Sequence, residues 1–356
     1  MNELSSFYKN KKVLVTGATG FKGSWLCSWI LKMGEKVYVI GFVPNKNKYL
    51  FYSLKLQNKI SLKLFDIRDL KKLKNFIYAA KPSIIFHMAA QPIVYESFNN
   101  PFLTFDVNAK GTLNVLEASK KSKFVKSIVC ITSDKCYENT GIVKGYKETD
   151  KLGGVDPYSA SKASAELIVR SYRESIYNKK KCGISSVRAG NVIGGGDFSP
   201  ERLIPDCVKF IRKRKKIKIR NPKFNRPWQF VLEPLNGYLV LAKKQYENPS
   251  KFSSAWNFGP GGKSIATVKD VVKKIVNFWG YGSFQVKKSY KISEHHNLQL
   301  DITKAKKILK WKPIYDFNSS IKTTVEWYFR VFENKENPQK VTDYQIEQYM
   351  NKGNIF

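Results

Sequence analysis

The amino-acid sequence predicts an α/β protein in which a doubly wound parallel sheet is followed by a smaller mixed α/β lobe. The first observation is the regular alternation of short, continuously apolar strand patterns with helical patterns over residues 12–188. Strands that are apolar on both faces fit a parallel sheet covered by helices on each side, and right-handed crossovers wind such a sheet in both directions. The second observation is a glycine-rich turn between the first strand and the first helix, which is typical of Rossmann-like sheets.

The predicted elements follow one another in the order that this fold requires. Strand patterns occupy residues 12–16, 36–42, 61–65, 83–87, 127–132 and 183–188, and helical patterns occupy residues 25–33, 71–80, 105–121 and 157–178. After residue 188 the pattern changes to a loop-rich region, with a strand at 254–258, a helix at 268–279 and two helical patterns within 303–332 that are broken at Pro313. We therefore predict a first domain over residues 1–190, which the late strand rejoins, and a lobe formed mainly by residues 191–356.

The composition excludes several classes of protein. With 356 residues, of which 42% are apolar, the chain can bury a sizeable core and is not a disordered chain. No apolar run approaches the ~20 residues that span a bilayer. The N-terminus lacks an apolar signal core, so a cytoplasmic protein without a membrane partner is expected. Five scattered cysteines without a CxxC pair, and only three histidines, argue against a disulfide framework and against a metal site.

The charge balance raises the question of a nucleic-acid partner. The chain has 63 Lys and Arg residues against 28 Asp and Glu, a formal net charge of +35. Nucleic-acid-binding proteins concentrate such charge on one face or in a tail, whereas lysine is spread over this whole chain. The densest run, residues 209–220, is interrupted by apolar residues and is interpreted as the end of an amphipathic helix followed by a strand. We expect no nucleic-acid partner; a basic nucleotide- or nucleic-acid-binding protein with an idle site is the alternative from another class.

The glycine-rich turn is the first motif that carries chemistry. It lies in the segment TGATGFKG, residues 16–23, and its glycines follow the spacing G-x-x-G-x-x-G between a strand and a helix. Glycines there permit a tight turn and a close approach of the backbone to a pyrophosphate, which then meets the positive end of the helix. We predict a dinucleotide site whose cofactor-binding residues in this turn are Gly17, Thr19, Gly20, Phe21, Lys22 and Gly23.

The sequence leaves the choice between NAD and NADP open. The carboxylate that would accept from a ribose 2′-hydroxyl about 20 residues further on is missing, while Lys46 and Lys48 could meet a 2′-phosphate. Asp66 and Ile67, after the third strand, fit the adenine, because the carboxylate accepts from the exocyclic amine and the aliphatic chain packs on the ring. The alternative for Asp66 is a helix cap, since a helical pattern follows it.

A tyrosine and a lysine one helical turn apart form the second motif. Tyr158 and Lys162, in the segment YSASK, share one face of the predicted helix. A nearby ammonium and a positive nicotinamide ring stabilise a phenolate, so a tyrosine with an ordinary pKa near ~10 becomes a usable base near neutral pH. An exposed tyrosine on an ordinary amphipathic helix is the alternative, and the dinucleotide motif upstream disfavours it.

Together these motifs resemble the extended short-chain dehydrogenase/reductase family, over essentially the whole chain. Further resemblances are the segments HMAAQ at residues 87–91, NAKGT at 108–112 and RAGNV at 188–192. The resemblance implies NAD as cofactor, a nucleotide-sugar substrate in the second lobe, and a homodimer or homotetramer. It implies that Ala89, Ala90 and Gln91 line the cofactor, that Asn108 positions the active-site lysine, and that Asn191 contacts the substrate diphosphate.

The segment TSDKCYEN, residues 132–139, indicates the reaction. It resembles the branch of nucleotide-glucose 4,6-dehydratases, in which an aspartate at this place protonates the leaving 6-hydroxyl and a glutamate removes the C5 proton. Here Lys135 replaces that glutamate. This form, with FKGSWL at 21–26, DKLGG at 150–154, RPWQ at 226–229 and VLEPL at 231–235, resembles the members of the branch that act on CDP-glucose, so CDP-glucose is the implied substrate. The predicted catalytic residues are Ser133, Asp134, Lys135, Tyr158 and Lys162.

Several alternatives stay open at this stage. The C5 base is Lys135, a water that it orders, or another group, because a protonated lysine is a poor base unless burial or neighbouring cations lower its pKa. Asp134 and Lys135 can share a site only if the chain bends there, and an exposed salt-bridged turn is the other interpretation. A 4-epimerase on the same fold would need no acid at position 134. Arg202 and Arg226 are, with Asn191, the candidates for the substrate diphosphate.

Overall fold

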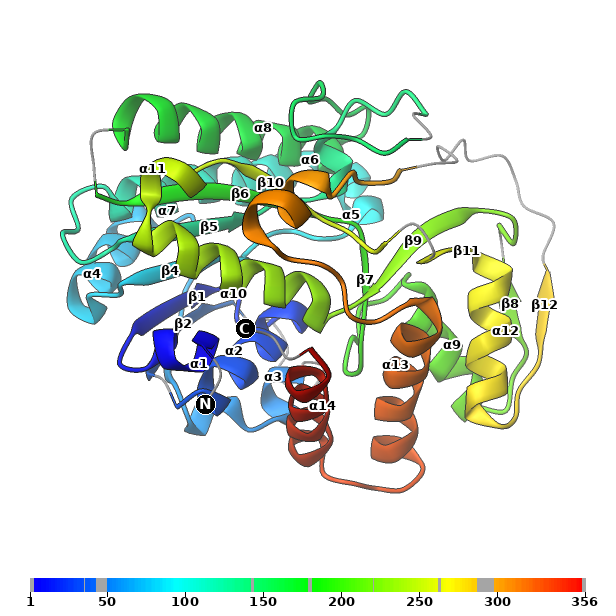
Figure 1. Cartoon of the computed structure of the whole chain (residues 1–356). Helices are drawn as coiled ribbons and strands as arrows, with labels where there is room; N and C mark the ends of the chain where they lie inside the picture. Colours follow the sequence, from blue (N-terminus) through cyan, green and yellow to red (C-terminus); the bar gives the residue numbers. More distant parts are fainter. Residues whose placement is uncertain are drawn as a thin grey trace.

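The computed structural model of the protein describes residues 3–34, 36–42, 50–141, 144–178, 181–219, 221–261, 264–286 and 298–353. A sheet of seven parallel strands forms its centre (Figure 1). The order reverses at the neighbours β1 and β4, and ligands of such sheets bind at that point, outside the carboxyl ends of the strands. The predicted doubly wound sheet is confirmed. From edge to edge the strands are β10 (Ala255–Phe258), β6 (Gly183–Ala189), β5 (Ser127–Ile131), β4 (Ile84–His87), β1 (Lys12–Thr16), β2 (Lys36–Gly41) and β3 (Ser61–Leu64).

Both faces of this sheet are buried under helices. Along β1, Val13 and Val15 point into one apolar core and Leu14 into another, because successive side chains of a strand alternate between the two faces. All three side chains are fully buried, which is why the strand patterns are continuously apolar. One core lies under α2 (Phe21–Lys32) and α10 (Leu232–Glu247), and the other lies under α4 (Leu70–Ala80), α7 (Gly111–Ser119) and α8 (Pro157–Ser171).

The predicted helices are present, with two interruptions. The pattern at 105–121 contains a π-helical turn, and the pattern at 157–178 ends in another. Such turns often occur at functional sites, and the first of them holds the predicted positioning residue Asn108. The segments are α6 (Pro101–Phe105), η3 (Asp106–Lys110) and α7 for the first pattern, and α8 and η5 (Tyr172–Ile176) for the second.

The second half of the chain builds a lobe beside the carboxyl ends of the strands (Figure 1). It contains a three-stranded sheet of β7 (Asn191–Ile193), β9 (Asn225–Phe230) and β11 (Ile265–Thr267), and a pair of β8 (Ile217–Ile219) with β12 (Phe284–Val286). Its helical segments are α9 (Leu203–Arg212), α12 (Val268–Trp279), η7 (Ala305–Leu309) and α13 (Phe317–Phe332). The remaining helices are α1 (Glu3–Tyr8), α3 (Leu50–Ser53), α5 (Val94–Asn99), α11 (Pro249–Phe252) and α14 (Pro338–Gly353), and short 3₁₀ turns lie at η2 (Leu56–Asn58) and η4 (Asp134–Cys136).

The two halves of the chain are interleaved. The strand predicted at 254–258 is β10, which pairs with β6 at the edge of the main sheet. Helix α10, which the sequence analysis did not predict, packs on β5 and β6, and α14, also not predicted, packs on α2. Both helices carry proline near their start, at Pro234 and Pro338, where proline is tolerated but obscures a helical pattern.

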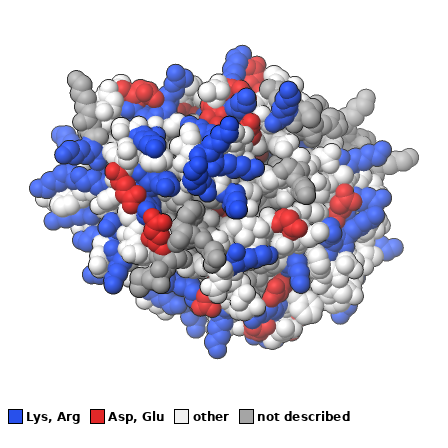
Figure 2. Space-filling view, in the orientation of Figure 1, with Lys and Arg blue, Asp and Glu red and all other residues white. Residues whose placement is uncertain are grey.

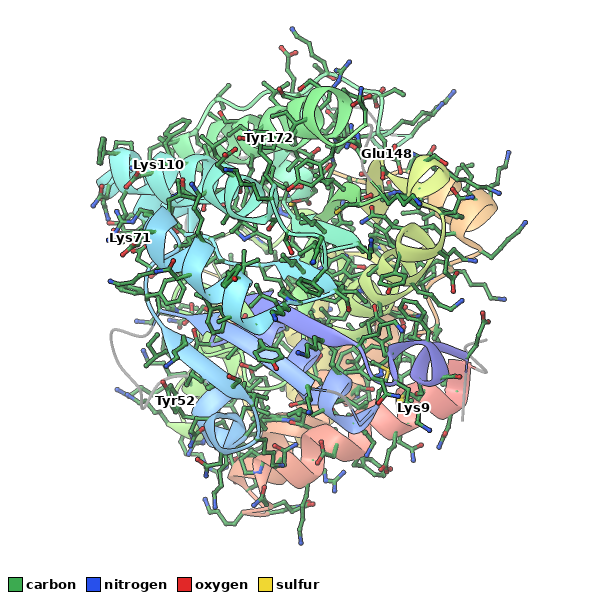
Figure 3. All side chains as sticks on the ribbon, turned by 90° about the vertical axis from the view of Figure 1, so that its left-hand side faces the viewer. Lys9, Tyr52, Lys71, Lys110, Glu148 and Tyr172 are labelled. Carbon is green, nitrogen blue, oxygen red and sulfur yellow. The ribbon has the colours of Figure 1, made fainter. Side chains whose placement is uncertain are left out.

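The positive charge is distributed over the surface. Lysine and arginine side chains cover the visible face in several groups, with acidic side chains between them (Figure 2). In the side view, Lys9, Lys71 and Lys110 lie on the outside of the molecule (Figure 3). Within the basic run, residues 209–212 form the end of α9 and residues 217–219 form β8, as predicted, and the isoleucines are buried.

No helix in the described part of the chain is long and apolar enough to span a membrane. Within those residues there is also no group of three or more His, Cys, Asp or Glu that could hold a metal ion. All five cysteines are buried, and none of them forms a disulfide.

Candidate active site

The glycine-rich turn forms a cradle between β1 and α2. Gly17 has a φ of +71°, and a Cβ atom on it would lie 2.6 Å from the backbone of Ala89 at the end of β4. A Cβ atom on Gly23 would lie 2.4 Å from the carbonyl oxygen of Gly17. Gly20 precedes α2 and has no side chain that could cap the helix. The first backbone N–H groups of α2 therefore lie at this cradle without a side-chain acceptor. The turn therefore fits the pyrophosphate of a dinucleotide, which needs close backbone contact and free N–H groups.

Thr19 and Phe21 connect the same turn to its surroundings. The Thr19 hydroxyl donates to the Phe42 carbonyl at 3.4 Å, and its methyl group fills the space beside Gly41 at the end of β2. The Phe21 ring packs close to Gly194, which follows β7. The turn is thus held between the main sheet and the second lobe.

Lys22, in the first turn of α2, faces the centre of the site. It is half-buried, and the charges that act on its ammonium are those of Lys162, Arg202 and Asp134. Burial, followed by the two cations, lowers the pKa of Lys22 to about 7. An anionic ligand would stabilise its charged form.

Dinucleotide binding is therefore expected to be coupled to proton uptake by Lys22. The negative charge of the pyrophosphate should raise the pKa of Lys22 above 7. The affinity for the dinucleotide should therefore increase as the pH falls toward 7. The increase stays below about tenfold per pH unit, which is the limit when one proton is taken up. Calorimetry of NAD binding in buffers of different ionisation enthalpy measures the uptake. Lys22→Met should remove the uptake between pH 7 and 8 and weaken binding, whereas Lys135→Met should keep it. Equal uptake in wild type and Lys22→Met would contradict this assignment.

The end of β4 is fixed by a buried polar network. The His87 ring contacts the hydroxyls of Thr16 at 2.8 Å and Thr112 at 3.0 Å, and burial lowers its pKa to about 3, so the ring is neutral. The Thr16 hydroxyl also accepts from the Ala89 N–H at 3.3 Å. Sequence analysis assigned no role to His87; its apolar strand context gave no signal of these partners.

Asn108 links two segments of the site. Its side chain accepts from the Gln91 N–H at 2.8 Å and donates to the Ser161 hydroxyl at 2.9 Å, next to Lys162. Asn108 thus joins the segment that contains Ala90 and Gln91 to α8.

Asp66 and Ile67 follow the carboxyl end of β3, at the same edge of the sheet as the glycine-rich turn. Asp66 is half-buried and forms an ion pair with Arg68 at 2.8 Å, while Ile67 is buried against Gly111. The helix-cap alternative for Asp66 is wrong, because Asp69 caps α4 by accepting from the Lys72 N–H. Lys46 and Lys48 lie outside the described residues.

The chain bends directly after β5, as a shared site for Asp134 and Lys135 requires. Residues 134–136 form the 3₁₀ turn η4, and the Ser133 hydroxyl donates to Asp134 at 3.0 Å and accepts from the Lys135 N–H at 3.2 Å. Asp134 is only 6% exposed, so the interpretation as an exposed salt-bridged turn is wrong. Burial raises the pKa of Asp134, which suits a general acid, while the Lys135 ammonium opposes that shift. Lys135 itself is half-buried.

Tyr158 and Lys162 face this turn from α8. Asp156 caps that helix by accepting from the Ser159 N–H. Burial raises the pKa of Tyr158 to about 12, while a hydrogen bond with Ser133 and the charge of Arg202 act in the opposite direction. Burial lowers the pKa of Lys162 to about 8, and its ammonium lies 3.4 Å from the Ile131 carbonyl oxygen. From the sequence, Lys162 is predicted to acidify Tyr158. In the structure, the charge of Asp134 raises the pKa of this phenol and the charge of Arg202 lowers it.

The substrate-binding candidates come from the second lobe. Asn191 begins β7, and Arg202 precedes α9 and pairs with Asp197 at 3.0 Å. Arg226 lies on β9, and its charge opposes the increase that burial causes in the pKa of Asp134. The charges of Arg202 and Arg226 therefore act on the same site from two different elements, which sequence spacing does not reveal.

Gly190 provides the space that Asp134 occupies. A Cβ atom on Gly190 would lie 2.9 Å from Asp134 Oδ2, so Gly190→Ala should displace the carboxyl group. We expect elimination to slow by roughly ten- to a hundredfold, as for small misplacements of reacting groups, with cofactor affinity unchanged. Stopped-flow kinetics and cofactor titration measure the two. Gly261→Ala is the control, because its Cβ would make only ordinary contact at 3.9 Å; equal effects of both changes would contradict the prediction.

The doubly wound sheet holds this cradle, and Ser133, Tyr158 and Lys162 lie at its carboxyl edge. This combination defines a dinucleotide-dependent enzyme of the short-chain dehydrogenase/reductase type. Residues 14–324 match the family model of GDP-mannose 4,6 dehydratase. The chain is 43% identical over 329 residues to the CDP-glucose 4,6-dehydratase of Salmonella typhimurium, covering 91% of this chain and 92% of that protein. It is 26% identical over 344 residues to the human dTDP-D-glucose 4,6-dehydratase, covering 94% of each. The chain therefore belongs to the GDP-mannose 4,6 dehydratase family.

Solved structures share the fold. A double mutant of the dTDP-glucose 4,6-dehydratase of Streptomyces venezuelae, with NAD bound, has a TM-score of 0.77 at 20% identity, covering 92% of this chain and 99% of that one. The UDP-glucose 4-epimerase of Thermotoga maritima has a TM-score of 0.75 at 24% identity, covering 91% of this chain and all of that one.

Proposed function

We propose that the protein is a CDP-glucose 4,6-dehydratase, which converts CDP-glucose to CDP-4-keto-6-deoxyglucose with NAD as its cofactor. The observation that carries this proposal is the buried Asp134, placed on a bend beside Ser133 and opposite Tyr158 and Lys162. The 43% identity to a CDP-glucose 4,6-dehydratase over most of both chains supports the choice of nucleotide sugar.

Each residue of the site has its own role in the proposed reaction. The glycine-rich turn would hold NAD, which would supply the hydride acceptor for C4 of the sugar and the hydride donor for C6. Tyr158 as phenolate takes the proton of the 4-hydroxyl, and Ser133 donates a hydrogen bond to the C4 oxygen. The resulting ketone acidifies C5–H, and Asp134 protonates the leaving 6-hydroxyl so that water departs. Lys162 keeps Tyr158 acidic.

Lys135, or a water that it orders, assists removal of the C5 proton, and a proton returns to C5 when hydride reaches C6. It lies on the same turn as Asp134 and is half-buried. Asn191, Arg202 and Arg226 hold the substrate diphosphate, because their amide and guanidinium donors suit phosphate oxygens.

The mass of the product tests this function. The pure protein, incubated with CDP-, dTDP-, GDP- and UDP-glucose, should release a product that has lost one water, with CDP-glucose as the preferred substrate. A product of unchanged mass would favour the 4-epimerase instead, for which a buried acid at Asp134 has no use. No product from any of the four would exclude the dehydratase, and salt-dependent binding to random duplex DNA would then favour the basic nucleic-acid-binding alternative.

A second copy of the chain fits an exposed apolar surface on α5, α6, α7 and α8. We define the helix-side surface as Tyr95, Phe98, Phe102, Leu113 and Leu167, whose exposures range from 37% to 80%. Large apolar groups gathered in this way indicate a protein interface. A homodimer, or a homotetramer built from it, would bury them. Phe102→Lys should lower the mass measured by light scattering to that of a monomer; an unchanged mass would exclude this surface.

The cellular role follows from the chemistry of substrate and product. Both ligands are nucleotides of the cell interior, which supports a cytoplasmic location. A 4-keto-6-deoxy sugar nucleotide supplies deoxysugars, which supports a role in surface polysaccharide such as lipopolysaccharide O-antigen.

A further inference from the structure

A buried network joins the turn that carries Ser133 and Asp134 to the helix that carries Tyr158 and Lys162. Its centre is Glu166, which lies one turn after Lys162 on α8 and is only 2% exposed. The mechanism proposed above uses this carboxylate in no step.

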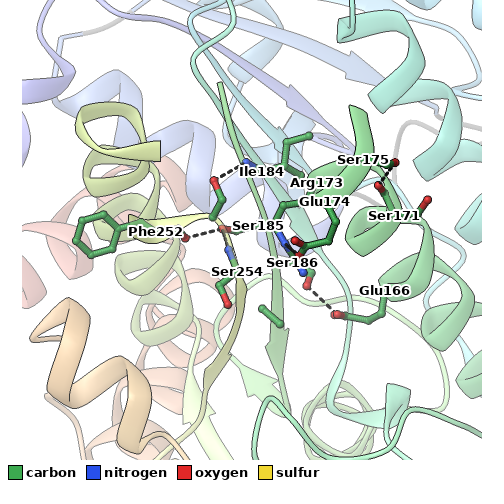
Figure 4. Close-up of polar contacts among 12 residues, drawn as sticks. Glu166, Ser171, Arg173, Glu174, Ser175, Ile184, Ser185, Ser186, Phe252 and Ser254 are labelled. Carbon is green, nitrogen blue, oxygen red and sulfur yellow. Dashed lines mark hydrogen bonds and ion pairs between the residues drawn. The ribbon is translucent and has the colours of Figure 1, made fainter. Parts of the chain in front are cut away.

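Three groups from two strands bind the Glu166 carboxylate. Arg188 on β6 forms an ion pair with it at 2.7 Å, and both side chains are almost completely buried. Ser186, two residues earlier on the same face of β6, donates to it at 2.7 Å (Figure 4). Thr132, the residue directly before Ser133, donates to it at 2.5 Å. The start of the catalytic turn is thereby tied to α8.

The other end of the turn is tied to Arg188. The second guanidinium nitrogen of Arg188 donates to the Tyr137 hydroxyl at 2.6 Å, and the guanidinium lies 4.7 Å from the centre of the Tyr137 ring. Tyr137 directly follows η4, and its own hydroxyl donates to Asn257 on β10 at 2.8 Å. The turn is therefore anchored on both sides, by Thr132 before it and by Tyr137 after it.

The segment at β6 also contacts the turn near Asp134. Ser186 and Arg188 are two residues apart, so they share one face of β6, and Gly190 directly follows the strand. Gly190 leaves the space in which the Asp134 carboxyl group lies. The Asp134 carboxyl group therefore lies against Gly190, two residues after Arg188.

A buried ion pair adds little stability compared with well-packed apolar residues, but its hydrogen bonds are directional. We propose that Glu166 and Arg188 are positioning residues, which hold the turn of Asp134 in register with Tyr158 on α8. Tyr158, which takes the 4-hydroxyl proton, and Asp134, which protonates the 6-hydroxyl, can then both contact one sugar ring. This inference rests on the proposed function, because it assumes two proton transfers on one substrate.

The test removes one anchor at a time and leaves the ion pair in place. Thr132→Val keeps the shape of the side chain but loses its donor, and Tyr137→Phe loses the hydroxyl at the other end. In both variants we expect elimination to slow by roughly ten- to a hundredfold. Oxidation at C4 and the KM for CDP-glucose should stay within about twofold of wild type. Reduced cofactor should therefore accumulate on the enzyme, which stopped-flow absorbance measures directly.

Two further variants separate positioning from general stability. Thr132→Ser retains the donor and should restore the wild-type ratio of the two rates. Ser185→Ala removes a buried hydroxyl from β6 that faces Phe252 and Gln245 instead of Glu166, so it should leave that ratio unchanged (Figure 4). Equal slowing of both steps in Thr132→Val and Tyr137→Phe, or an unaltered ratio, would overturn the inference. Absence of a dehydrated product from CDP-glucose with wild type would overturn the proposed function itself.

Discussion

Asp134→Asn lowers the rate of product formation by about 10²- to 10⁴-fold, the range expected for loss of a general acid, while the substrate still reduces the bound cofactor. Asparagine has the size of the aspartate and keeps an oxygen that the Ser133 hydroxyl can reach. It has no acidic proton for the leaving 6-hydroxyl, so the reaction stops at the 4-ketone. Absorbance of the reduced cofactor and the mass of the product together measure the two steps.

The pH dependence of elimination tests the same assignment. Burial raises the pKa of Asp134 above its ordinary value, and the acid must be protonated to act. The rate of elimination in wild type should therefore fall as the pH rises through this pKa, and Asp134→Asn should lack that decline. Asp270→Asn, at the exposed start of α12, is the control for the same chemical change far from the site. Full turnover by Asp134→Asn would exclude the carboxyl as the acid.

Tyr158→Phe should lower the rate of the first step, oxidation at C4, by a factor of about 10² to 10⁴. The phenol is 8% exposed, and in the cofactor-free protein burial raises its pKa to about 12. The positive nicotinamide ring, Arg202 and Lys162 must lower that value before the phenolate can take a proton. The oxidation rate in wild type should therefore increase with pH.

The two variants distinguish the half-reactions. With Asp134→Asn, reduced cofactor accumulates; with Tyr158→Phe, it does not form. Tyr78→Phe, on the exposed surface of α4, provides the matched control for loss of a phenolic hydroxyl. Accumulation of reduced cofactor at the wild-type rate in Tyr158→Phe would contradict the role of this tyrosine.

The sequence predicted the parallel strands, because residues buried on both faces leave a continuous apolar pattern such as that around Val13 and Val15. It also predicted the cradle, since Gly17 and Gly23 occupy positions where a Cβ atom has no room. The pair Tyr158 and Lys162 followed from one helical turn of spacing. These features depend on neighbours in the sequence or on backbone geometry, which local patterns record.

The features that the sequence did not predict depend on partners far along the chain. The buried His87 is held by Thr16 and Thr112, and no local pattern names those partners. The bend at η4 allows Asp134 to be buried, and only the fit against Gly190 explains it. Arg202 contributes to the same site from the second lobe, through the placement of α9.

The return of β10 to the edge of the main sheet has a consequence for biosynthesis. On the ribosome, residues 1–190 emerge with β6 as an unpaired edge and without α10 over β5 and β6. Unpaired edges and uncovered apolar faces favour aggregation. At ~5–20 residues per second, several seconds pass before β10 is translated. The high contact order of this pairing delays completion of the sheet, so the nascent chain should depend on chaperones during that interval.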